Sequence, residues 1–212
     1  MRRAVAAGVA CAVVVLAVAA CSGSSDEDMP GLTASPTASS TPEETPTPTP
    51  SESPTSIAGT VVDLSDPELG IVFEDLPELS GDEADVFNWM STYRLEYWRT
   101  MRTNVASPGF AVFTSAEIQA EMARLAAGNV EDGWTVGGVF HVTIGDIAVD
   151  GDTAVATSCD DYSAVTVTDP DGPVTLEEAG VAAPVLLRVT LARGATAEGL
   201  WTVLTTEGAG TC

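Results

Sequence analysis

The sequence predicts an α+β domain in which N-terminal helices pack on a curved antiparallel sheet, preceded by an apolar leader and a proline-rich segment. Two patterns predict the order of the elements. Between residues 82 and 103, apolar side chains recur at spacings of three, four and seven, as in an amphipathic helix. From Trp134 onward, apolar and polar residues alternate in runs separated by turn signals, as in antiparallel strands. Helices followed by such strands favour the α+β class.

The leader, residues 1–20, has the pattern of a lipoprotein signal peptide. Arg2 and Arg3 precede an uncharged run, and the small residues Val18-Ala19-Ala20 stand directly before Cys21. A positive start, an apolar centre and a small-residue exit are the parts of a secretory signal. We expect cleavage before Cys21 and lipidation of its sulfur, which would anchor the chain on the outer face of the cell membrane. The alternative is a retained single-span anchor, for which the uncharged run is barely long enough.

Residues 21–56 are predicted to form an extended tether, and residues 57–212 a single globular domain. The tether holds more than half of the chain's 13 prolines, with Ser, Thr and acidic residues between them. So few apolar side chains cannot offset the entropy lost on folding, and proline favours an extended chain. The remaining residues are numerous enough for one sizeable core.

The acidic composition argues against some partners, and missing motifs argue against cofactors and metals. The formal net charge of −23 gives a surface that repels nucleic acid and anionic lipid headgroups. No cofactor is predicted, since the chain has neither a P-loop nor a dinucleotide fingerprint. No metal is predicted either, because the segment 169–172 lacks the spacing of a calcium-binding loop. We expect the acids of this segment, together with Asp160 and Asp161, to serve turns.

Two capping boxes mark the expected helix starts. Ser80-Gly81-Asp82-Glu83 precedes the helix over 82–103. Thr114-Ser115-Ala116-Glu117 precedes a second helix, with Phe113 and Ile118 as its hydrophobic staple and a stop at Gly128-Asn129. The residues expected to face the core are Ala84, Phe87, Met90, Tyr97, Trp98 and Met101 in the first helix, and Ile118, Met122 and Leu125 in the second.

The strands are expected from alternation and turn signals. Asp150-Gly151 is a hairpin signal, and Asp169–Pro173 is a second turn cluster. The strands themselves are predicted over residues 140–144, 153–159, 185–192 and 200–205, with a Gly- and Ala-rich loop over 193–199.

Cys159 and Cys212 are the cysteines of the predicted domain. Outside the cell, two thiols in one small domain are expected to pair. Their spacing fits neither a CxxC redox motif nor a zinc site. We therefore predict a structural disulfide between them.

His141 and the aromatic residues of the first helix are candidate functional residues. His141, the single histidine, lies on the strand face opposite Phe140 and would be a general base if that face lined a pocket, and a surface residue otherwise. Tyr93, Tyr97 and Trp98 stand near arginines on the first helix, and aromatics beside arginine could bind a sugar or lipid fragment by stacking and hydrogen bonding; Tyr97 and Trp98 are the candidate ligand-binding residues. In the alternative interpretation they are core residues, with Arg94 and Arg102 at the rim and Arg99 paired with Glu96.

The segments Val149–Cys159 and Leu200–Cys212, together with the order of helices and strands, resemble a group of actinobacterial lipoproteins with a nuclear transport factor 2-like domain. The resemblance covers roughly residues 80–212 and implies a bent sheet that wraps helices into a cone with a pocket at its wide end. The superfamily includes ketosteroid isomerases, polyketide cyclases and dehydratases. Their catalytic motifs, an Asp or a His–Asp pair with an acidic oxyanion donor, do not match this sequence residue by residue.

These observations favour a membrane-anchored, non-enzymatic binding or protein-interaction module of the cell envelope. Its expected partners are the membrane, through the lipid anchor, and an envelope protein or a small apolar ligand. The alternative is a small lyase or isomerase that holds an apolar ligand in the cone and uses His141 as its base. A third interpretation is an assembly factor that docks on another envelope protein, which a large exposed apolar patch would favour.

Overall fold

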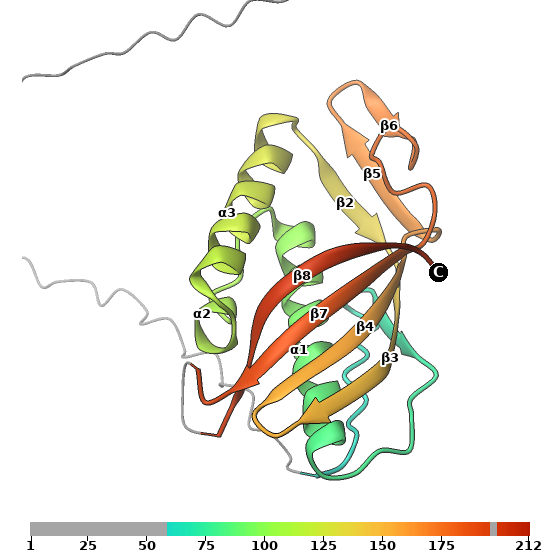
Figure 1. The fold of residues 1–212 in the computed structure, drawn as a ribbon. Helices are drawn as coiled ribbons and strands as arrows, with labels where there is room; N and C mark the ends of the chain where they lie inside the picture. Colours follow the sequence, from blue (N-terminus) through green and yellow to red (C-terminus); the bar gives the residue numbers. More distant parts are fainter. Residues whose placement is uncertain (1–58, 196–198) are drawn as a thin grey trace, which may run out of the picture. The chain divides into compact units, whose positions relative to one another are not determined.

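A computed structural model describes residues 59–195 and 199–212. The predicted leader, Cys21 and the whole predicted tether lie outside these residues. The described part is an α+β structure whose helices lie on one face of an open, curved and mostly antiparallel sheet (Figure 1), as predicted. Within it, no helix is both long enough and apolar enough to cross a membrane.

The strands form two sheets. The larger has the order β1-β3-β4-β7-β8, in which β1 runs parallel to β3 and the other pairs are antiparallel; the smaller has the order β2-β5-β6. The elements are β1 (Ile71–Glu74), α1 (Asp82–Thr103), α2 (Phe110–Phe113), α3 (Ala116–Glu131), β2 (Thr135–Gly138), β3 (Phe140–Asp150), β4 (Thr153–Asp161), β5 (Val165–Asp169), β6 (Gly172–Val174), β7 (Val185–Arg193) and β8 (Trp201–Thr211).

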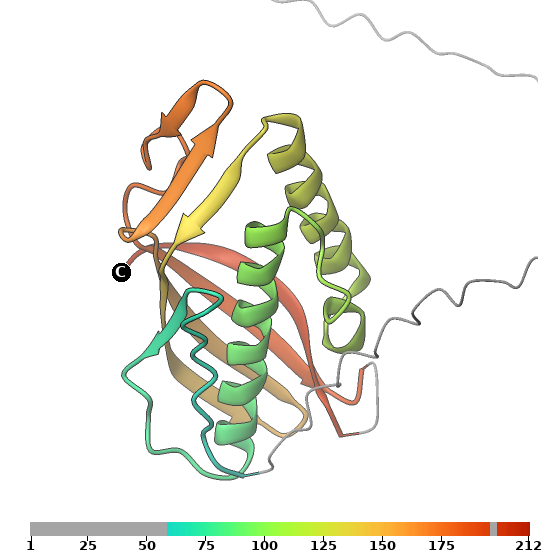
Figure 2. The same ribbon diagram turned by 180° about the vertical axis from the view of Figure 1, so that it is seen from behind.

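Helix α1 is the centre of the core and has the predicted bounds. It lies against the curved sheet (Figure 2), and its buried positions run around most of its circumference. The buried hydroxyls of Ser91, Thr92 and Thr100 donate to backbone carbonyls one turn earlier, at 3.0, 2.8 and 2.9 Å. These local bonds let a helix with polar residues lie in the core, because the buried hydroxyls keep their hydrogen bonds.

The predicted capping box of α1 is wrong. Gly81 caps the helix with φ 62° and no side-chain hydrogen bond, and its carbonyl accepts from the Asp85 N–H at 3.0 Å. Ser80 cannot serve as the cap, because it forms a β-bridge with Thr60. Glycine suits this position because it adopts a positive φ without a steric penalty.

Helix α3 begins one residue later than its capping box predicts and ends later than expected. Ser115 is the N-cap: its Oγ accepts from the Ile118 N–H at 3.3 Å, and its own N–H donates to the Val203 carbonyl of β8 at 2.9 Å. The helix continues to Glu131 past the predicted stop. Asn129 is buried there, and its side-chain amide donates to Asn104 Oδ1 at 3.1 Å, which gives it a role within the helix.

The predicted strands are present, and several elements were not predicted. The Asp150-Gly151 hairpin joins β3 to β4, and β8 extends well beyond residue 205. The short helix α2 and the strands β1, β2, β5 and β6 were missed. Gly138 ends β2 so close to β5 that a Cβ there would lie 2.2 Å from the Ala164 carbonyl oxygen, which only glycine permits.

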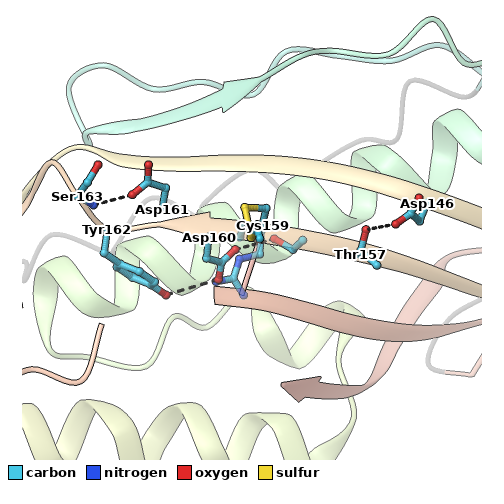
Figure 3. Close-up of a disulfide and its surroundings, with 10 residues drawn as sticks. Asp146, Thr157, Cys159, Asp160, Asp161, Tyr162 and Ser163 are labelled. Carbon is cyan, nitrogen blue, oxygen red and sulfur yellow. Dashed lines mark hydrogen bonds and ion pairs between the residues drawn. A yellow bond between two sulfur atoms is a disulfide. The ribbon is translucent and has the colours of Figure 1, made fainter. Parts of the chain in front are cut away.

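Cys159 and Cys212 are joined in the disulfide that the sequence predicted, with their Cα atoms 6.0 Å apart. The bond lies beside β4 (Figure 3). In the sheet, β7 lies between β4 and β8. The disulfide therefore spans β7 and links Cys212, which follows β8, to the central strand β4. Alternation along β4 places Cys159 on the face opposite Ser158 and Asp160, whose side chains are buried.

Candidate functional site

A cavity of about 330 Å³ lies between α1, α3, the inner side of the large sheet and the segment before β7. Its lining combines apolar side chains with tyrosines and charged groups. The lining residues are Tyr93, Arg94, Tyr97, Glu121, Met122, Leu125, Asp160, Tyr162, Val181, Val185, Leu187, Thr206 and Gly208.

All three tyrosines of the chain line this cavity. Tyr93 and Tyr97 are four residues apart on α1 and therefore share a helix face, and Tyr162 follows β4 directly. The hydroxyl oxygens of Tyr97 and Tyr162 are 3.1 Å apart and share a hydrogen bond. The cavity thus brings two phenols from α1 together with one from the segment that follows β4.

An ion pair between Arg94 and Asp160 lies beside these tyrosines. Arg94 Nη2 donates to Asp160 Oδ2, and the two side chains are 2% and 1% exposed. Ser158 Oγ donates to Asp160 Oδ1 at 2.6 Å, and Tyr162 OH donates to Oδ2 at 3.5 Å (Figure 3). The guanidinium carbon of Arg94 lies 4.4 Å from the centre of the Tyr97 ring.

The pair corrects two predictions. Arg94 is not at the rim of α1 but deep in the domain, and Asp160 does not serve a turn but lies inward on β4. The reason is shared, because each charge compensates the other and both can be buried together. Asp161 and Asp169 do serve turns: each accepts a hydrogen bond from a backbone N–H two residues later, at 2.8 Å.

Burial sets the protonation of these groups. Burial acts to lower the pKa of Arg94, but the Asp160 carboxylate and the neighbouring tyrosines together outweigh this effect and raise the pKa, so the guanidinium stays protonated. Burial raises the pKa of Asp160, while Arg94 and the hydroxyl donors oppose the increase. Burial also raises the pKa of Tyr93, Tyr97 and Tyr162, so these phenols are neutral hydrogen-bonding groups at physiological pH.

His141 does not line the cavity. Its side chain is 33% exposed on the outer face of β3, and its Nδ1 lies 2.8 Å from Oε1 of the exposed Glu74. Phe140 and Val142 point inward instead and are fully buried. The hypothesis that His141 is a general base in the pocket is therefore wrong, because the apolar face of the strand is the one that meets the helices.

Only one of the two candidate aromatic ligand-binding residues on α1 reaches the cavity. Tyr97 lines it, whereas Trp98 is fully buried: its ring stacks on Phe140 with centroids 5.1 Å apart, and its Nε1 donates to the Leu69 carbonyl at 3.0 Å. The pairing of Arg99 with Glu96 is confirmed, and Arg102 is exposed.

Asp160 and Tyr162 are the cavity residues of interest that were not predicted as site residues. A signal for them exists, since Ser158 and Asp160 alternate along β4 and Tyr162 continues the same spacing directly after it. In the described ranges, no three His, Cys, Asp or Glu side chains come together in a way that could hold a metal ion. The chain matches no model of a known protein family, and no curated protein shows significant similarity to it.

Proposed function

We propose that the protein is a lipid-anchored lipoprotein on the outer face of the cell membrane, and that its domain is a non-enzymatic module that binds a small, largely apolar ligand. The observation that carries the proposal is the cavity that the three tyrosines line. Apolar walls with a few convergent hydrogen-bonding groups are the usual composition of a ligand site. The small residues before Cys21 supply the location.

A nuclear transport factor 2-like cone would account for the position of this cavity. Helices α1 and α3 lie on the inner side of the curved sheet (Figure 2), and the cavity lies between them and the strands β4, β7 and β8. In a cone of this kind, the space that the helices leave at the open end of the sheet is the pocket.

The charge balance of the cavity favours an uncharged ligand. Arg94 is already compensated by Asp160, and Glu121 adds a further negative charge to the wall. An anionic ligand would meet these carboxylates, and a cationic one would meet the protonated Arg94. Tyr162 donates its proton to Asp160 and Tyr97 donates to Tyr162, so the Tyr97 oxygen can instead accept a hydrogen bond from a single hydroxyl group on an apolar body.

The isomerase or lyase alternative would now depend on Asp160 rather than on His141. The chain of hydrogen bonds from Tyr97 through Tyr162 to Asp160 favours it, because a carboxylate beside phenols can move a proton next to a carbonyl. Asp160, however, accepts from Arg94, Ser158 and Tyr162. Because both of its oxygens are already engaged and its side chain is 1% exposed, Asp160 is poorly placed to take a proton from a ligand, and binding without chemistry is therefore the better account.

Titration with 1-octanol, an apolar chain with one hydroxyl, tests the proposal. Since every tyrosine lines the cavity, octanol in the cavity should perturb the near-ultraviolet absorption of the phenols. Leu187→Trp should fill the cavity and abolish this signal. Leu186→Trp is the matched control: it places the same group on the opposite face of β7 and should leave binding unchanged.

A saturable signal that Leu187→Trp removes and Leu186→Trp keeps would support binding, and no signal in the unmodified chain would contradict it. The enzymatic alternative has its own readout. If the domain exchanged the α-hydrogens of cyclopentanone for deuterium, and Asp160→Asn abolished the exchange, the non-enzymatic proposal would be wrong.

A further inference from the structure

Two surface hollows continue the tyrosine-lined cavity along α3. The cavity and the first hollow, which is also about 330 Å³, share Glu121 and Leu125 in their walls. The first hollow and the second, of about 380 Å³, share Trp134. The three spaces therefore adjoin one another, from the interior of the domain, past the end of α3, to the β5–β6 hairpin.

Trp134 lies between the two hollows and is held firmly in place. The backbone N–H of Trp134 donates to the Asn129 carbonyl at 2.8 Å, and the backbone carbonyl of Trp134 accepts from Asn104 Nδ2 at 2.6 Å. Gly133, with φ 69°, approaches the hairpin so closely that a Cβ there would lie 2.9 Å from Pro170 Cδ. Because the backbone on both sides of the indole is fixed before binding, little entropy is lost when a ligand packs on it.

Trp134 is also the partly exposed tryptophan of the chain. The other three of its four tryptophans, Trp89, Trp98 and Trp201, are at most 3% exposed. A large apolar ring that is partly exposed between two hollows is a suitable surface for a flat partner, and the neighbouring polar side chains decide which partner fits.

The first hollow offers both hydrogen-bond donors and acceptors. Arg124 supplies donors and has no ion pair or hydrogen bond of its own within residues 59–195 and 199–212. Glu121 and Asp132 supply acceptors. Hydroxyl groups donate and accept, so a polyhydroxylated group can use all of these side chains. An anionic group would meet the carboxylates, and a cationic one would meet Arg124.

We propose that the ligand is an elongated amphipathic molecule whose apolar part lies in the cavity and whose neutral, hydroxylated end, such as a sugar ring, stacks on Trp134. The inference rests on the proposed function, because it needs an occupied cavity. It adds a second subsite and the chemical class of the ligand: the apolar C–H face of the ring covers the indole, while its hydroxyls reach Arg124, Glu121 and Asp132.

Probes that share an octyl tail test this class on the full chain held in amphipol, at concentrations below micelle formation. They are octyl glucoside, 1-octanol, octyl sulfate and octyltrimethylammonium. Phenol absorption reports the cavity, and acrylamide quenching of tryptophan fluorescence reports the partly exposed Trp134. We expect octyl glucoside to bind about tenfold more tightly than octanol, which is a difference of about 1.4 kcal/mol, and to protect Trp134 from quenching.

Variants locate the glucose end. Trp134→Ala should make octyl glucoside bind no more tightly than octanol. It should leave the dissociation constant of octanol within about twofold of that of the unmodified chain, a difference well below 1 kcal/mol. Arg124→Ala should weaken octyl glucoside by about threefold or more, the effect of one lost hydrogen bond. Arg188→Ala is the matched control, because it removes the same charge from an exposed position on β7 that lines none of these spaces.

The outcomes separate this inference from the proposed function. Equal binding of octyl glucoside and octanol, or tighter binding of either charged probe, would overturn the inference while leaving the cavity as a ligand site. An octyl glucoside advantage that survives both Trp134→Ala and Arg124→Ala would overturn it as well. If neither octanol nor octyl glucoside changed the phenol absorption, the proposed function would be contradicted and this inference would fall with it.

Discussion

Arg94 of α1 and Asp160 of β4 form an ion pair whose side chains are 2% and 1% exposed to solvent. The pair joins the central helix to the middle strand of the large sheet and forms part of the cavity wall. Charges this deeply buried need both a counter-charge and further hydrogen bonds. Ser158 and Tyr162 supply those bonds, and Tyr97 joins the same network through its hydrogen bond with Tyr162.

Arg94→Met should lower the free energy of unfolding by about 3–5 kcal/mol, because it leaves Asp160 buried without its counter-charge. The double variant Arg94→Met/Asp160→Leu should recover most of this loss, since it removes both charges. Urea denaturation measures both effects. As a control, Arg99→Met breaks the Arg99–Glu96 pair, in which Arg99 is 42% exposed, and should cost less than about 1 kcal/mol. Equal losses for Arg94→Met and Arg99→Met would contradict the structural role of the buried pair.

The tyrosines should make the folded domain sensitive to alkaline pH. Burial raises the pKa of all three phenols above the value of about 10 that they have in an unfolded chain. Above that pH the unfolded chain releases protons that the folded domain retains, so the contribution to stability is complete below pH 10 and is lost as pH rises through the folded pKa values. Absorption of phenolate against pH, in native buffer and in urea, measures the difference.

In that titration, phenolate should form at higher pH in the native protein than in urea. Tyr162→Phe should remove one of the three phenol signals, because the chain has no other tyrosines than those of the cavity. Coincident titration curves in the two solvents would show that the phenols are accessible to water and that the cavity is not as described.

The disulfide should stabilise the domain and hold the end of β8 in place. Cys159 and Cys212 are separated by 53 positions, and closing a loop of that length is worth about 4 kcal/mol in the chain-entropy model. The double variant Cys159→Ser/Cys212→Ser should therefore unfold at a lower urea concentration. Its backbone amides over 208–211 should also exchange with solvent faster. Two free thiols in the exported, unreduced protein would contradict the pairing.

Lipidation of Cys21 should determine membrane attachment. Cys21→Ser removes the sulfur that the acyl chains would modify, so this variant should leave the membrane fraction, while the unmodified protein remains in it. Cys11→Ser is the matched control, since Cys11 lies within the predicted leader, and it should not change the distribution. Continued retention of Cys21→Ser would favour an uncleaved membrane-spanning anchor.

Local patterns in the sequence predicted local structure well. The apolar spacing over 82–103 gave the bounds of α1, and the Asp150-Gly151 turn gave the β3–β4 hairpin. The prediction left open which way His141 faces, although the alternation around it decides the question. The apolar face of a half-buried strand meets the core, so the histidine must face outward.

Contacts between distant residues could not be predicted in this way. Arg94 and Asp160 are 66 positions apart, and nothing in either local pattern indicates that one charge compensates the other. The strand β1 was missed for a similar reason, because its four residues form a strand through parallel pairing with β3. Arg94 and Asp160 both line the cavity, and the candidate site was therefore the least predictable part of the fold.

Native mass spectrometry of the full-length gene product, extracted gently from its own membrane, tests the central claim most directly. The account predicts a chain that begins at Cys21, carries covalent acyl groups and retains a small neutral molecule without a covalent bond. The Leu187→Trp variant should lack that molecule but keep the acyl groups. A chain that retains residues 1–20, bears no acyl group and binds no small molecule would contradict the account.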